Sequence, residues 1–133
     1  MPISDFLLDN VNEEEKVEVH IKRFKSPFVI KSITEAENDA IRKRCTIKVK
    51  ARNGMNVPET NTSKYTGELI AASVVEPDLH NSELQEHYST PGSAVDTLRA
   101  MLRPGEFALL SEKVQEINGY DLDVDDLKEE AKN

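Results

Sequence analysis

The sequence has no tryptophan, only one cysteine, few aromatic residues and no long apolar run. A single cysteine cannot form an intramolecular disulfide, so the composition favours a reducing compartment such as the cytosol. The longest apolar run, residues 69–75, is far shorter than the roughly 20 residues of a membrane-spanning helix. No basic start followed by an apolar core and a small-residue cleavage site is recognisable, so we expect no secretory leader.

The sequence also lacks the motifs of common catalytic and nucleotide-binding sites. It contains no phosphate-binding loop, dinucleotide fingerprint or G-x-S-x-G element. Asp121, Asp123 and Asp125 alternate as at the start of a calcium loop. Asp126 and Lys132, however, stand where such a loop needs Gly and Glu. We therefore interpret these aspartates as part of a solvated acidic tail.

His80, Glu83 and His87 would share one face of a helix, which is how some zinc ligands are arranged. The pattern is not that of a zinc protease, because Leu84 follows Glu83 and no other His or Cys lies nearby. Cys45 has no local motif of a nucleophile and is interpreted as a small buried side chain. We expect no catalytic residue, metal or cofactor, and a metal hydrolase that uses the two histidines is kept as a rival hypothesis.

Charge is distributed unevenly along the chain, whose formal net charge is −8. Residues 1–66 contain 12 basic and 10 acidic side chains, whereas residues 67–133 contain 5 and 15. The acidic second half disfavours contact with nucleic-acid phosphates and favours solubility. The first half nevertheless contains a basic strip, so the alternative function is a small nucleic-acid-binding regulator. The basic strip consists of Arg42, Lys43, Arg44, Lys48, Lys50 and Arg52.

The clearest single element is a helix within residues 102–120. Pro104 suits a first helical turn, and the carboxylate of Glu106 lies near the positive end of the helix dipole. Gly119 stands where helices commonly end in a left-handed residue. Apolar residues recur between these signals at spacings of three and four, which predicts one buried stripe. The stripe consists of Phe107, Leu110, Val114 and Ile117.

Strand patterns occur only in the first half of the chain. Residues 16–22 alternate between apolar and polar, and residues 28–30 form a short apolar run, which together predict an antiparallel pair. Residues 46–51 alternate again, and the Asn-Gly pair at 53–54 is a strong hairpin signal. Residues 55–57 are the expected returning strand, stopped by the proline that follows.

Helices are predicted between and after these strands. Residues 34–37 fit a capping box for a helix at 35–44 with Ala40 and Ile41 facing inward, and a competing interpretation extends this helix through Lys50.

Another helix is expected at 64–76, capped by Thr62 or Ser63, followed by short helices at 82–88 and after Ser93.

These patterns predict an α+β fold, with a small antiparallel sheet and hairpins in the N-terminal half and a helical C-terminal half. We expect residues 1–120 to form a single domain and residues 121–133 to form an acidic tail. Tyr120, Leu122 and Val124 alternate with aspartates, a pattern typical of segments that become ordered on a partner. We name these three residues as candidate partner-binding residues, with an edge strand or frayed terminus as the alternative.

Three stretches together resemble a known family. They are IKSITEAENDAIRKRCT (30–46), KYTGELIAASVVEPDLHNSELQEHY (64–88) and LRPGEFALLSEKVQEINGYD (102–121). The chain is similar in these stretches to the PBSX-type, XkdN-like tail assembly chaperones of phages and prophages of Gram-positive bacteria. The resemblance extends in order over residues 25–126, and its most specific parts are the RPGEF joint and the EINGYD ending.

The resemblance implies a non-enzymatic protein of the host bacterial cytoplasm that is absent from the mature virion. Such proteins are thought to bind the tape measure protein, keep it soluble and help to recruit tail tube subunits. These are therefore the expected partners, with self-association left open and no nucleic acid or membrane expected. The resemblance identifies no binding residue by motif.

The resemblance also implies a longer form made by ribosomal frameshifting near the end of the gene. Ala131, Lys132 and Asn133 can be encoded by an A-rich slippery sequence, so we expect an overlapping reading frame at this point. Reading the gene tests this expectation, and an in-frame stop without any overlapping frame would contradict it.

Overall fold

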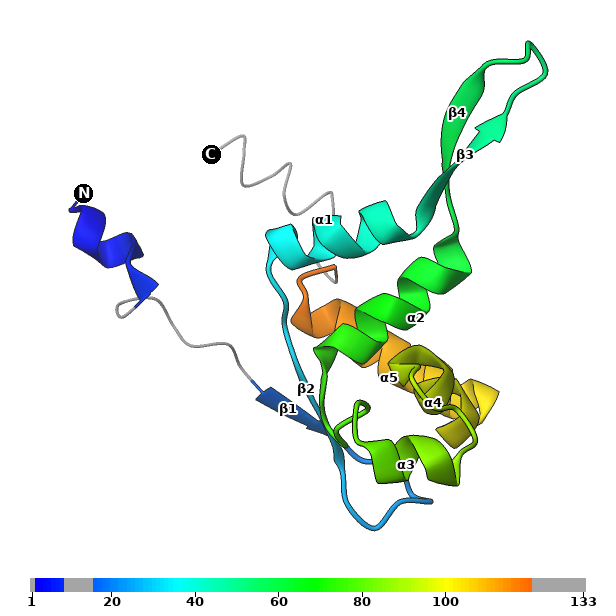
Figure 1. Ribbon diagram of the computed structural model, residues 1–133. Coiled ribbons are helices and arrows are strands. Elements are labelled where there is room, and N and C mark those ends of the chain that lie inside the picture. The colour runs from blue at the N-terminus through cyan, green and yellow to red at the C-terminus, as the bar shows by residue number, and fades with distance from the viewer. Residues whose placement is uncertain (1, 9–15, 121–133) are drawn as a thin grey trace.

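The computed structural model describes residues 2–8 and 16–120 of the chain, and its core is a small sheet covered by helices (Figure 1). Three antiparallel strands are ordered β1 (Lys16–Val19), β2 (Phe28–Lys31) and β5 (Val74–Glu76). Ile30 of the central strand pairs with Val17 on one side and Val74 on the other, and its side chain is fully buried in the core. The α+β prediction is therefore confirmed, with the third strand contributed by the second half of the chain.

The predicted helix at 64–76 is wrong at both ends. Helix α2 covers Thr62–Ser73, and the next three residues form β5. Two consecutive β-branched valines favour a strand, and β2 offers an open edge with which they pair. At the other end, the N-cap is Asn61 rather than Thr62 or Ser63, because the Asn61 side chain accepts a hydrogen bond from the Lys64 N–H at 3.1 Å.

The hairpin prediction is confirmed, and the alternative of a helix continuing through Lys50 is wrong. Helix α1 (Glu35–Arg44) leads into β3 (Thr46–Lys50), which pairs with β4 (Asn56–Thr60) as a two-stranded arm that projects from the body (Figure 1). The prediction that the returning strand covers residues 55–57 and stops at Pro58 is wrong, because β4 continues to Thr60. Pro58 is tolerated because it lies opposite Lys48 at a position whose backbone groups point away from β3, so its missing N–H costs no hydrogen bond. Within α1, Ile41 is buried as predicted, but Ala40 is exposed and Asn38 is buried in its place.

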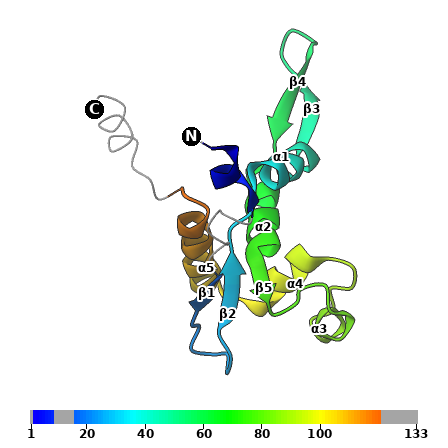
Figure 2. The same ribbon diagram turned by 90° about the vertical axis from the view of Figure 1, so that its left-hand side faces the viewer.

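The remaining helices are α3 (Ser82–His87), α4 (Ala94–Met101) and α5 (Pro104–Ile117), together with the 3₁₀ turn η1 (Ile3–Phe6), which has no buried residue. Figure 2 shows α5 beside β1 and β2, which it contacts, while α2 contacts α1, α4, α5 and β5. None of the helices in the described part of the chain is both long and apolar enough to cross a membrane.

The buried core is formed mainly by β1, β2, α2, α4 and α5. On α5, Leu110 and Val114 of the predicted stripe are fully buried, whereas Phe107 and Ile117 are half-buried. The core residues are Val19, Ile21, Phe28, Ile30, Leu69, Ile70, Leu79, Leu98, Met101, Leu102, Leu110 and Val114.

An arginine–glutamate pair joins the loop after β1 to the start of α5. Arg23 donates from Nε and Nη2 to the Glu106 carboxylate at 2.8 and 2.6 Å, and Nη2 also donates to the Met101 carbonyl at 2.9 Å. The backbone N–H of Arg103 donates to the same carboxylate at 2.7 Å. These hydrogen bonds, above all those from Arg23, lower the pKa of Glu106 to about 2.

Helices α2 and α4 approach closely at Gly67. A Cβ at this position would lie 2.8 Å from Val95 Cγ1 and 2.9 Å from Arg99 Nη2. Arg99 is itself held in place, because Nη2 donates to the Ser63 carbonyl at 2.9 Å and its guanidinium lies 4.9 Å from the centre of the Phe107 ring. Glycine is therefore needed at position 67 because α4 packs closely against α2 there, not because the backbone turns.

The Glu106→Gln variant is expected to be less stable than the wild type at neutral pH, because a neutral amide pairs poorly with Arg23. The folded-state pKa of Glu106 lies below its usual value of 4.5, so this stabilisation is present above about pH 4.5 and is lost as the pH falls towards 2. Urea unfolding at a series of pH values should show a stability difference that shrinks in acid. Glu112→Gln, on the exposed face of α5, is the control, and a Glu106→Gln difference that is independent of pH would contradict the assignment.

The Gly67→Ala variant is expected to be destabilised by about 1 kcal/mol. Alanine gains about 1 kcal/mol in helix propensity over glycine, but overpacking against Val95 costs about 1–3 kcal/mol. Gly105→Ala is the matched control, because a Cβ there has no atom within 4 Å and the variant should be at least as stable as the wild type. Urea unfolding of both variants checks this, and a Gly67→Ala protein as stable as Gly105→Ala would refute the packing argument.

Candidate partner-binding surface

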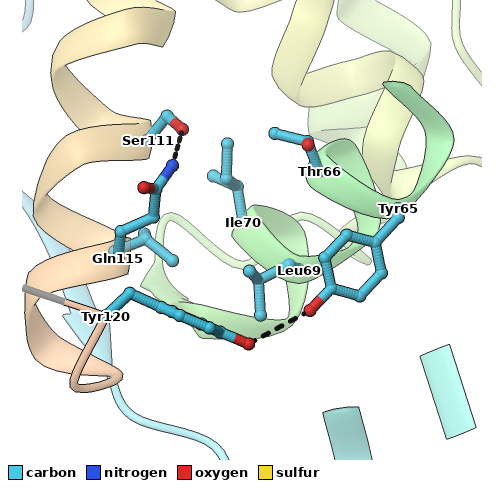
Figure 3. Close-up of a pocket in the computed structure, with 8 residues that line it drawn as sticks. Tyr65, Thr66, Leu69, Ile70, Ser111, Gln115 and Tyr120 are labelled. Atoms are coloured by element: carbon cyan, nitrogen blue, oxygen red, sulfur yellow. Dashed lines mark hydrogen bonds between the residues drawn. The ribbon is translucent and has the colours of Figure 1, made fainter. Parts of the chain in front are cut away.

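Tyr120 is positioned by the way in which α5 ends. Gly119 has a φ of +86°, a backbone conformation that strains any residue with a side chain. The Gly119 N–H donates to the Glu116 carbonyl at 3.0 Å, and the Tyr120 N–H donates to the Gln115 carbonyl at 2.9 Å. These two bonds form a Schellman motif, which turns the chain back so that the Tyr120 side chain lies beside α2 (Figure 3).

Tyr65 of α2 is the second aromatic residue of this surface. Its hydroxyl donates to Asn38 Oδ1 and lies 3.3 Å from the Tyr120 hydroxyl (Figure 3). Burial, and next the hydrogen bond with Tyr120, raise the pKa of Tyr65 to about 12. The Tyr65 phenol is therefore protonated at physiological pH and serves as a donor to Asn38, whose side chain is buried and needs a partner.

Two pockets flank the Tyr120 side chain, which lines both. The first, of about 190 Å³, lies between α2 and α5 and has Leu69, Ile70 and Val114 as its apolar lining (Figure 3). Its other lining residues are Tyr65, Thr66, Ser111, Gln115 and Tyr120. The second, of about 210 Å³, faces α1 and is more polar. It is lined by Ile33, Thr34, Glu35, Asn38, Leu69, Asn118 and Tyr120.

Asn118 holds the elements around these pockets together. Its Oδ1 accepts a hydrogen bond from the Ile33 N–H at 2.8 Å, at the junction between β2 and α1. Its Nδ2 donates to Ser73 Oγ at 3.2 Å, at the end of α2, and to the Val114 carbonyl at 2.9 Å within α5. One side chain therefore connects α5 with the end of α2 and the junction between β2 and α1, at the edge of the second pocket, which Asn118 lines.

The structure locates one of the three predicted partner-binding residues at this surface. Tyr120 is 55% exposed and separates the two pockets, whereas Leu122 and Val124 lie outside the described residues. Sequence analysis does not identify Tyr65 or Asn118. Two sequence features could have indicated them. Tyr65 lies four positions before the buried Leu69 and so shares its helix face, and Asn118 directly precedes the glycine that ends α5.

The chemical environment of Cys45 is that of an inert thiol. The side chain is 1% exposed, and Sγ donates to Glu68 Oε2 at 2.9 Å. Burial, followed by the hydrogen bond to Glu68, raises the pKa of Cys45 to about 11. The nucleophilic thiolate is therefore disfavoured at physiological pH, as the interpretation of a buried structural residue predicts.

The structure gives no support to a metal site. Within residues 2–8 and 16–120, no group of three His, Cys, Asp or Glu side chains is close enough to hold an ion, and this includes His80, Glu83 and His87. Glu83 and His87 line a small surface pocket on α3 from which His80 is absent. The alternating aspartates at 121, 123 and 125 lie outside the described residues.

The basic strip is divided into two parts with different surroundings. On α1, Arg42 and Lys43 lie 3.4 and 3.2 Å from the Asp39 carboxylate. Arg44 lies 3.1 Å from the Glu68 carboxylate. The other members are exposed on the hairpin, and no ion pair links them to a described acidic residue. They are Lys48, Lys50 and Arg52, so only half of the strip is free to contact a polyanion.

Comparison with known proteins gives consistent matches over nearly the whole chain. The family model described as "Phage XkdN-like tail assembly chaperone protein" matches residues 3–132. The phage-like element PBSX protein XkdN of Bacillus subtilis (strain 168) is 30% identical over 98% of this chain and 93% of its own length. The YqbN protein of the same strain is 33% identical over the same shares.

A solved structure supports the same assignment. The crystal structure of the protein YqbN superposes with a TM-score of 0.75 and 26% sequence identity, and the match covers 91% of this chain and 98% of that chain. Sequence and fold therefore agree, and the chain belongs to the family of phage XkdN-like tail assembly chaperone proteins.

Proposed function

We propose that this protein binds the tape measure protein before the tail tube forms around it, and that it helps to bring in tube subunits. Membership of the tail assembly chaperone family supports a role in tail assembly through protein contacts. The finer steps follow from what the resemblance implies for such chaperones. In this proposal the protein acts without catalysis in the host bacterial cytoplasm and is absent from the finished virion.

The observation that carries the proposal is the position of Tyr120 between two pockets. The partly apolar pocket between α2 and α5 suits the apolar side chains of an amphipathic helix, and the polar pocket beside α1 suits its flanking polar groups. Tyr120 is more than half exposed, so its side chain can rotate away from α2 at little cost. The two pockets would then join into one groove beside Leu69, which lines both.

The candidate residues Leu122 and Val124 extend this groove in the proposal. They lie two and four positions after Tyr120, and their alternation with aspartates is suited to a segment that becomes ordered on a partner. A long helical client exposes apolar faces before assembly, and a surface of this kind would cover one of them. The acidic second half of the chain would keep the resulting complex soluble.

A nucleic-acid-binding function is less well supported. Affinity for phosphate groups requires free, accumulated positive charge, but the α1 part of the basic strip is paired with Asp39 and Glu68. The three free cations on the hairpin are few for a protein whose net charge is −8.

Tyr120→Glu is expected to reduce affinity for the tape measure protein of the same phage by at least about tenfold. The substitution places a charge between two pockets that the client's side chains enter, and loss of a central aromatic contact alone typically costs more than 1 kcal/mol. Tyr120→Phe should bind nearly as well as the wild type. Co-expression and affinity measurement on the soluble complex provide the readout.

Leu109→Glu is the matched control, because Leu109 is an exposed apolar residue of α5 that lines neither pocket. If Tyr120→Glu retains the client as well as Leu109→Glu does, the proposed surface is wrong. If the tape measure protein aggregates equally with and without the wild-type chain, the chaperone function towards this client is wrong.

A further inference from the structure

The β3–β4 hairpin has an apolar face that no other part of the described structure covers. Register places Ile47 and Val49 of β3 on the same face as Val57 of β4, and the Ala51–Met55 pair continues this face towards the turn. Glu59, which pairs with Ile47, is the one charged residue on this face and lies at its base. Ile47 is 62% exposed, Met55 66% and Val57 39%. These large side chains form one contiguous exposed stripe, which is a feature of interaction surfaces.

The two edges of the hairpin differ in their capacity to accept another strand. The Asn61 N–H donates to the Cys45 carbonyl, and the Ala51 N–H donates to the Met55 carbonyl. Since hydrogen-bonded and non-hydrogen-bonded pairs alternate along an antiparallel ladder, residues 47 and 49 also point their backbone groups towards β4. It follows that residues 46, 48 and 50 direct their N–H and C=O groups to the outer edge of β3. The outer edge of β4 contains Pro58, which has no N–H to donate.

The lysine side chains of β3 favour an acidic strand as the partner of its open edge. Lys48 and Lys50 project from the face opposite Ile47, and neither forms an ion pair with a described residue. Lysines on an edge strand discourage pairing with a neutral strand or with a second copy of the same edge. A strand with acidic side chains on one face and apolar ones on the other would be complementary on both faces.

One segment of this chain has that pattern. Residues 121–126 read DLDVDD, so in an extended conformation Asp121, Asp123 and Asp125 share one face while Leu122 and Val124 share the other. Beside β3, the aspartates would lie along Lys48 and Lys50, and the two apolar side chains would cover Ile47 and Val49.

The same chain's own β3 is a poor acceptor for this segment. Tyr120 lies beside Thr34, Glu35 and Asn38, in the first half of α1, whereas β3 begins beyond the last residue of α1. Ten helical residues span about 15 Å. Residue 121 therefore starts too far from Thr46 for the next few residues to lie along β3, and a second copy of the chain has no such constraint.

We propose that residues 121–126 of one copy add as a strand to the free edge of β3 in a second copy, so that two chains exchange their C-terminal segments. A two-fold arrangement pairs both segments at once and leaves neither β3 edge open. This self-association concerns the free chain. Because Leu122 and Val124 are also the residues proposed to extend the client groove, the segment would have to leave β3 before it contacts a client.

The test is the association state of the full chain, measured by sedimentation equilibrium over a range of micromolar concentrations. The wild type is expected to form a dimer. Lys48→Glu/Lys50→Glu and Asp123→Lys/Asp125→Lys should each weaken dimerisation by at least about tenfold, because each places like charges opposite one another. An equimolar mixture of these two variants should dimerise again, since each segment then faces a hairpin of opposite charge.

Lys16→Glu/Lys22→Glu is the control, because it makes the same change in net charge at exposed positions away from the hairpin. Leu122→Asp/Val124→Asp removes the apolar contacts and should also be monomeric. A monomeric wild type would overturn the proposal. A dimer that resists the substitutions at 48 and 50, or a mixture that stays monomeric, would equally overturn it.

Discussion

The arrangement of the molecule depends on the change from helix to strand after Ser73. β5 begins at the next residue and pairs with β2, which anchors the end of α2 on the sheet. Ser73 is fully buried, and its hydroxyl accepts a hydrogen bond from Asn118 at the end of α5. Since α2 also contacts α1 and α4, this one junction sets the positions of four helices relative to the sheet. The pockets beside Tyr120 lie where two of these helices meet, so their geometry follows from the same constraint.

Much of the fold could be predicted from local patterns, because local energetics and tertiary packing agree in those places. Thr34 caps α1, Pro104 opens α5 and Gly119 ends it, each for reasons present within a few residues. Prediction failed where a distant partner decided the outcome. Val74–Glu76 continues an apolar helical pattern, but the open edge of β2 makes it a strand. Asn38 is buried in place of Ala40 because the Tyr65 hydroxyl, from another helix, satisfies its side chain.

The candidate site was predictable only in part, for a related reason. Tyr120 was identified from the acidic-hydrophobic alternation that begins there, which is a property of the sequence alone. The contributions of Tyr65 and Asn118 arise from hydrogen bonds between residues separated by 55 and 85 positions, which no local pattern reveals. The Asn61–Lys64 cap was missed because two equally good candidates, Thr62 and Ser63, follow it directly. For Tyr65 and Asn118 the missing information was which elements lie side by side, whereas for Asn61 it was which of three neighbouring residues adopts the cap conformation.

The hairpin has a further consequence for how the molecule opens. A two-stranded arm outside the core is marginally stable by itself. Its base is held by the Asn61–Cys45 backbone hydrogen bond and by the Thr46 hydroxyl, which donates to the Arg42 carbonyl of α1. The arm therefore forms its own local unfolding unit, in which amide protection decreases from the base towards Gly54 while the core stays folded. Because β3 and β4 contribute no residue to the core cluster, opening the arm leaves most of the global free energy of unfolding unchanged.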